Sequence, residues 1–189
     1  MGMDSHYFLA IPLPAESKQM IARWKEGAKE HLIFKKWVHE EDYHITLFFL
    51  GAVSAEQLNG LSEKMRRIAE EASSFTIPAG ETGYFGKPDQ PKIFWAGAKA
   101  VPMLVDIQRK IMAGCVEHGF SAEKREYRPH ITLARKWEGT DSFQKEVKKV
   151  PSLHAFEWTV DHFVLFKTHL NKDPKYEMVE KFTFGDVSY

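Results

Sequence analysis

The chain is poor in several features that usually point to a function. Its 189 residues hold one cysteine, Cys115, so an intramolecular disulfide is excluded, and its place on an apolar helical stripe is typical of a core residue. No apolar run approaches the roughly 18 residues of a membrane span. The N-terminal segment lacks the basic start and apolar run of an export signal. We therefore expect a cytoplasmic protein that does not enter a membrane.

Net charge and the short motifs of metal and nucleotide sites are also missing. The 26 basic residues balance the 26 acidic ones, which argues against a broad nucleic-acid-binding track but leaves the binding of a single RNA end open. There is no His-Glu-x-x-His motif, no cysteine pair and no glycine-rich phosphate loop. We therefore expect no metal ion, no other cofactor and no use of ATP.

What the chain does contain is a repeated tetrapeptide. His44–Leu47 and His130–Leu133 both read His-Ile-Thr-Leu, and each lies in an apolar run typical of a strand. On a strand, alternate residues share a face, so each copy presents an imidazole and a hydroxyl together and turns Ile and Leu the other way. Two such strands side by side would surround a space that suits a phosphate, because imidazoles exchange protons near neutral pH and hydroxyls bond oxygen atoms.

The repeat alone leaves a second interpretation open, namely two unrelated buried strands, each with one hydrogen-bonded histidine. The sequence around the repeat favours the first interpretation. The quoted flanks are Trp37–Tyr43 and Phe48–Gly51 around the first copy, Gly83–Gly86 and Ile93–Gly97 between the copies, and Tyr127–Pro129 and Ala134–Arg135 around the second. With these flanks, the chain from about Tyr7 to Phe184 resembles the bacterial RNA 2′,3′-cyclic phosphodiesterases, or 2′-5′ RNA ligase (LigT-like) family, of the two-histidine phosphoesterase superfamily.

The pattern of strands and helices indicates an α+β protein. The resemblance implies a bilobal fold in one domain over 1–189, with two pseudo-twofold-related lobes, mainly antiparallel sheets lining a central cleft, helices outside and one His-x-Thr-x motif per lobe. The predicted strands are Tyr7–Ile11, His44–Leu50, Phe75–Ile77, Gly83–Phe85, Lys92–Gly97, a strand from Pro129, Phe156–Lys167 and Tyr176–Phe184, and the predicted helices are 15–30, 54–72, Val101–His118 and Asp141–Lys149.

The resemblance also implies a role for each polar residue of the two motifs. His44 would donate a proton to the leaving 3′-oxygen, and His130 would accept a proton from water. Thr46, Thr132 and Arg135 would hold the phosphate. Strict strand alternation puts Arg135 on the face opposite His130, so it reaches the site only past the strand end or through a bulge.

The two motifs are not interchangeable, because Phe49 stands after His44 where Arg135 stands after His130. Other residues near the motifs have two interpretations each. Arg128 is either a phosphate ligand or part of a surface salt bridge, and Arg125 lies in a charged loop. Five aromatic residues are candidates to stack a base, although such residues in apolar strands usually belong to the core: Phe8, Trp37, Tyr84, Phe85 and Tyr127.

The function expected from these observations is hydrolysis of 2′,3′-cyclic phosphate ends of single-stranded or tRNA-derived RNA to 2′-phosphate ends, by a monomer. The same site run backwards would join such an end to a 5′-hydroxyl through a 2′-5′ linkage. Two alternatives stay open. One is the same chemistry on a small nucleotide or a cyclic phosphate of ADP-ribose, and the other is an RNA-end-binding module without catalysis.

Overall fold

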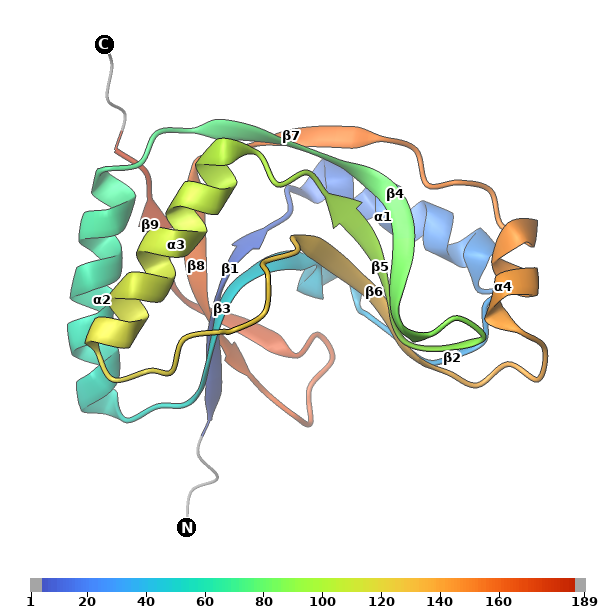
Figure 1. Ribbon diagram of the computed structural model, residues 1–189, viewed down its shortest axis with the longest axis horizontal. Helices are drawn as coiled ribbons and strands as arrows, with labels where there is room; N and C mark the ends of the chain where they lie inside the picture. The colour runs from blue at the N-terminus through green and yellow to red at the C-terminus, as the bar shows by residue number, and fades with distance from the viewer. Residues whose placement is uncertain (1–4, 186–189) are drawn as a thin grey trace.

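The computed structural model describes residues 5–185, and within them four α-helices, two 3-10 helices (η) and nine strands (Figure 1). The first four residues, part of the segment in which we expect no export signal, lie outside the described residues. In chain order the elements are β1 (His6–Pro12), α1 (Ala15–Ala28), β2 (Phe34–Trp37), η1 (Glu40–Asp42), β3 (His44–Ala52), α2 (Ala55–Glu70), β4 (Phe75–Lys87), β5 (Gln90–Ala98), α3 (Pro102–Glu117), β6 (His130–Trp137), α4 (Phe143–Glu146), η2 (Val147–Lys149), β7 (Phe156–Val160), β8 (His162–Thr168) and β9 (Tyr176–Thr183).

The strands form two antiparallel groups that meet at the repeated tetrapeptides. The strand order is β7-β4-β5-β6-β3-β1-β8-β9, with β2 added to β6. Strands β3 and β6, which carry the two motifs, are joined through one residue pair, Ile45 with Ile131. We call β3, β1, β8 and β9 with their helices the first lobe, and β7, β4, β5, β6 and β2 with theirs the second lobe. The fold is therefore α+β with two lobes, as predicted.

Helices cover the outer side of each lobe. Figure 1 shows α2 and α3 side by side over the first lobe, and α1 and α4 at the second. Trp24 of α1 packs on Phe94 of β5 with ring centroids 6.2 Å apart, and Phe143 of α4 packs on the same ring at 5.6 Å. These aromatic contacts bury the helices against the sheet and leave its other side for the polar residues of the motifs.

The buried face of each helix follows from its apolar stripe. In α2, Leu61 and Met65 are buried, and Ser54 caps the helix by accepting a hydrogen bond from the backbone N–H of Gln57 at 3.2 Å, as the sequence predicts. In α3, Cys115 is fully buried, which confirms it as a core residue. Burial raises the pKa of its thiol to about 12, so the thiol is inert at neutral pH.

Three predicted strands differ from the structure, and one strand of the structure was not predicted. The predicted strands Phe75–Ile77 and Gly83–Phe85 are one long strand, β4, whose two ends pair with β7 and β5. The predicted strand Phe156–Lys167 is two strands, because β7 pairs with β4 in the second lobe whereas β8 pairs with β1 and β9 in the first. Strand β2 was not predicted, since its four residues are too few to show an alternating pattern.

Candidate active site

The two motifs lie next to each other across the β3–β6 junction. The side chains of Ile45 and Ile131, which pair there, are fully buried. In an antiparallel pair, the residue before one isoleucine faces the residue after the other. These four neighbours all lie on the face opposite to the isoleucines. His44 therefore lies beside Thr132, and Thr46 beside His130, with all four side chains partly buried. The structure thus gathers two imidazoles and two hydroxyls around one local twofold axis.

Both imidazoles are held in the same orientation. The Nδ1–H of His44 donates to the carbonyl oxygen of Asp42 at 2.7 Å, and that of His130 donates to the carbonyl oxygen of Arg128 at 2.7 Å. A carbonyl oxygen only accepts hydrogen bonds, so the proton of each neutral ring sits on Nδ1 and the lone pair on Nε2. The hydroxyl of Thr46 donates to Nε2 of His44 at 3.0 Å. Each Nε2 is therefore the atom placed to exchange a proton.

Both histidines are neutral at pH 7 in the unliganded protein. Burial lowers the pKa of His44 to about 4, and the positive charge of Arg135, and of His130 whenever it is protonated, acts in the same direction. Burial also lowers the pKa of His130, again with help from Arg135. An anion between the rings would oppose these effects and raise both pKa values. The site is therefore suited to acquire a proton together with a negatively charged ligand.

A bulge places Arg135 on the motif face. The register of β6 against β5 shifts by one between Thr132 and Ala134, which leaves Leu133 without a partner. Leu133 and Ala134 are both fully buried, and the next side chain, Arg135, is exposed. The bulge reverses the strict alternation and returns Arg135 to the face of Thr132. The role of Arg135 as a phosphate ligand stays a prediction, but strand alternation no longer opposes it.

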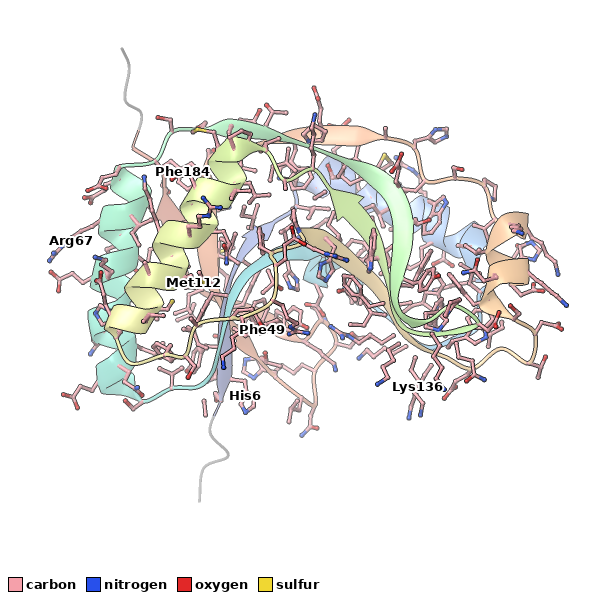
Figure 2. All side chains as sticks on the ribbon, in the orientation of Figure 1. His6, Phe49, Arg67, Met112, Lys136 and Phe184 are labelled. Atoms are coloured by element: carbon pink, nitrogen blue, oxygen red, sulfur yellow. The ribbon has the colours of Figure 1, made fainter. Side chains whose placement is uncertain are left out.

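The same bulge occurs in β3 and presents Phe49. The register of β3 against β1 shifts between Thr46 and Phe48, which leaves Leu47 without a partner. Phe48 is buried, whereas 68% of Phe49 is exposed, and Figure 2 shows it near the junction of the lobes. Phe49 is therefore the structural counterpart of Arg135. It was missed as a base-stacking candidate, although its equal spacing from the motif histidine was visible in the sequence.

Aromatic rings pack against His44 on the first-lobe side. The ring centroid of Phe8 lies 4.9 Å from that of His44, and Tyr176 meets the imidazole edge-on at 5.3 Å. Phe166 lies 6.0 Å away, and the exposed Phe49 contacts Phe8 at 5.7 Å. These rings explain the low pKa of His44, because they replace water with apolar carbon around the imidazole.

His130 has a smaller aromatic wall on the second-lobe side. Phe85 meets its ring edge-on with centroids 5.0 Å apart, and Trp95 lies at 6.3 Å. Any side chain at Gly83 would collide with the Trp95 ring, so this glycine lets the indole lie flat over β4. A Cβ at Gly97 would lie 3.2 Å from the same indole, so β5 also leaves room for the ring. Of the five aromatic candidates named above, Phe8 and Phe85 are therefore the two that contact a motif histidine.

The other three candidates have structural contacts. Trp37 packs on the buried Phe94 with centroids 6.3 Å apart, and Tyr84 packs on the buried Phe143 at 5.6 Å. The hydroxyl of Tyr127 donates to the backbone carbonyl of Thr46 at 3.0 Å, which ties the loop before β6 to β3.

The basic loop before the second motif has surface ion pairs. The side chain of Arg128 is 71% exposed and lies 3.6 Å from the carboxylate of Glu126. Arg125 pairs with Glu123 at 3.0 Å. These pairs favour the salt-bridge interpretation of Arg128 over the phosphate-ligand interpretation.

Asp42 links the site to the loop between β8 and β9 and was missed by sequence reasoning. The residue is 4% exposed, and its carboxylate accepts hydrogen bonds from the backbone N–H groups of Lys175 at 2.8 Å and Tyr176 at 3.1 Å. Its own carbonyl oxygen holds Nδ1 of His44. Asp42 therefore positions both the imidazole and the tyrosine ring that packs against it.

Residues 5–185 contain no group of three or more His, Cys, Asp and Glu side chains arranged to hold a metal ion. In the same part of the chain, no helix is both long and apolar enough to cross a membrane.

Comparisons with known proteins match most of this chain. A family model described as LigT like Phosphoesterase matches residues 11–95 and 99–176. The RNA 2′,3′-cyclic phosphodiesterase of Geobacillus stearothermophilus is 41% identical over 178 residues, which cover 94% of this chain and 57% of that protein. The protein of the same name from Bacillus subtilis (strain 168) is 37% identical over 179 residues, which cover 94% of this chain and 95% of that protein. A crystal structure of a Thermus thermophilus protein superposes with a TM-score of 0.78 at 26% identity and covers 97% of this chain and 100% of its own.

Proposed function

The chain belongs to the LigT-like phosphoesterase family, and from this premise we propose that it is an RNA 2′,3′-cyclic phosphodiesterase. It opens the cyclic phosphate at an RNA end and leaves a 2′-phosphate and a 3′-hydroxyl. The observation that carries the proposal is the pair of imidazoles on one face, each with Nδ1 fixed by a carbonyl oxygen and Nε2 left to exchange a proton, with the hydroxyl of Thr46 at 3.0 Å from Nε2 of His44. A site for binding alone has no need for two groups that transfer protons.

The reaction needs two proton transfers, and each lobe supplies the histidine for one of them. Nε2 of His130 takes a proton from water as the water oxygen attacks phosphorus. The bond from phosphorus to the 3′-oxygen breaks, and Nε2 of His44 gives its proton to that oxygen. The hydroxyls of Thr46 and Thr132 and the guanidinium of Arg135 hold the non-bridging oxygens, where negative charge increases in the transition state. Solvent then returns both imidazoles to their starting protonation states.

The negative charge of the bound substrate allows His44 to become protonated and so to act as the acid. His44 is neutral in the free site because burial lowers its pKa to about 4. The cyclic phosphate carries one negative charge, which stabilises the protonated imidazole next to it. The proton is therefore bound with the substrate, and no metal ion is needed to neutralise the phosphate. The same groups run backwards would join a cyclic phosphate end to a 5′-hydroxyl, but water at about 55 M makes hydrolysis the net direction for dilute ends.

Product identification tests the proposal. An RNA with a 2′,3′-cyclic phosphate end should give a 2′-phosphate end with the purified protein. A 3′-phosphate product would show that the leaving oxygen was assigned wrongly, and no product would favour the RNA-end-binding module. Faster turnover of a small cyclic nucleotide or an ADP-ribose cyclic phosphate than of RNA would favour the small-molecule alternative. The monomeric state, the single domain and the cytoplasmic location stay predictions.

A further inference from the structure

Three cationic side chains converge beside the candidate site. Lys36 of β2 is paired with Arg135 of β6 in the strand ladder. Lys175, in the loop before β9, is partly buried, and its pKa is lowered first by that burial and then by the positive charges of Lys36 and Arg135. Three segments far apart in the sequence thus bring three positive charges to one place, and Figure 1 shows β2, β6 and the β8–β9 loop on the same side of the molecule.

These charges are not neutralised by acidic partners. Within residues 5–185, none of Lys36, Arg135 and Lys175 takes part in an ion pair. The acidic group that acts on Lys175 is Asp42, whose carboxylate is already occupied by two backbone N–H groups. Like charges this close repel one another, so an uncompensated cluster favours an anionic ligand.

The backbone holds the cluster together against this repulsion. The β2–β6 ladder keeps Lys36 next to Arg135, and the buried carboxylate of Asp42 keeps the backbone of Lys175 in place from the other side. The backbone that carries these side chains therefore does not have to be ordered by the ligand, which lowers the entropic cost of binding.

We propose that Lys36 and Lys175 form a second phosphate subsite, which takes the phosphodiester on the 5′ side of the terminal nucleotide while the two motifs hold its cyclic phosphate. The bulge in β6 returns Arg135 to the face of the motifs, and the β2–β6 ladder pairs Arg135 with Lys36, so Arg135 connects the two places. In an RNA end, the phosphate nearest to the cyclic phosphate is the one attached to the 5′-oxygen of the same ribose. The subsite makes the enzyme prefer oligonucleotide ends to cyclic mononucleotides without reading a base, and it rests on the proposed function.

Three substrates test the subsite, of which the first has only the cyclic phosphate and the other two also carry a phosphate on the 5′ side. They are a nucleoside 2′,3′-cyclic phosphate, the same nucleoside with a 5′-phosphate, and a dinucleotide that ends in the cyclic phosphate. The wild-type kcat/KM should rise about tenfold or more from the first substrate to the third. The double variant Lys36→Gln/Lys175→Gln should lose most of this ratio. This variant no longer neutralises the second phosphate. For the dinucleotide, the slope of log(kcat/KM) against log salt concentration should therefore become shallower by about 0.7.

A matched control changes the same charge on the same two elements. The double variant Lys35→Gln/Lys172→Gln alters exposed lysines of β2 and the β8–β9 loop and should keep the wild-type ratio. Thermal unfolding checks that both variants fold. Equal ratios in the two double variants, or a wild type indifferent to the 5′-phosphate, overturn the subsite alone. A gain from the terminal 5′-phosphate but not from the dinucleotide overturns the assignment to an RNA phosphodiester. No turnover of any of the three substrates by the wild type overturns the proposed function and the subsite with it.

Discussion

Acid should destabilise this protein through His44. Burial lowers the pKa of the folded-state imidazole to about 4, against an ordinary value of about 6.5 in the unfolded chain. Between these two values the unfolded state binds a proton that the folded state does not, so the free energy of unfolding falls as the pH falls. Above pH 6.5 both states are neutral at this residue and the effect vanishes. From pH 7.5 to pH 4.5, this one group should remove roughly 2–3 kcal/mol of stability.

The assay compares wild type with His44→Asn in urea unfolding followed by tryptophan fluorescence at both pH values. Other titrating groups affect both proteins, so their contributions cancel in the difference. The wild type should lose roughly 2–3 kcal/mol more than the variant on going to pH 4.5. The control His154→Asn removes an exposed histidine and measures the effect of losing any imidazole.

Titration of the His44 ring by NMR tests its low pKa directly. The ring should stay neutral down to about pH 4 in the free protein, and inorganic phosphate should raise its pKa because the anion stabilises the imidazolium. The stability difference between wild type and His44→Asn could be the same at both pH values, or the pKa of His44 in the free protein could be near 6.5. Either result would show that the aromatic rings around His44 do not exclude water from the imidazole.

Three further predictions concern the reaction. His44→Ala and His130→Ala should each lower turnover by roughly 10²–10⁴, and the double variant by less than the product of the two losses; near-normal activity in either folded single variant would remove the two-histidine mechanism. Activity should survive excess EDTA and need no ATP, and its loss on chelation with recovery on adding one divalent ion would reveal a missed metal site. Arg135→Met should lower kcat/KM by roughly 10–150-fold and weaken inhibition by phosphate or sulfate, and a similar effect from Arg125→Met would sink the role given to Arg135.

Much of the chemistry could be predicted from short-range patterns. The period of two in a strand follows from covalent geometry, so each His-x-Thr-x motif determines which side chains share a face. The apolar stripe of α2, its Ser54 cap and the buried Cys115 follow in the same way from local spacing. These patterns indicated the α+β class and the candidate residues His44 and His130, whereas the two-lobed arrangement was implied by the family resemblance that the flanks carry.

Other features depend on which strands become neighbours, and local spacing carries no information about that. The paired bulges at Leu47 and Leu133, which turn Phe49 and Arg135 to the motif face, exist only in the registers of β3 with β1 and β6 with β5. The division of 156–167 into two strands likewise reflects partners in different lobes.

The most distant links were decided by tertiary structure alone. Asp42 binds the backbone of Lys175, which is 133 positions away. Lys36 pairs with Arg135 because β2 lies beside β6, and a strand of four residues is too short to be predicted from the sequence. The low pKa of His44 has the same origin, because it arises from rings that β1, β8 and β9 bring around one imidazole. The sequence by itself determined which groups can do the chemistry. Tertiary structure decided their protonation, orientation and neighbours, because desolvation and electrostatic interactions depend on distances in space rather than on spacing along the chain.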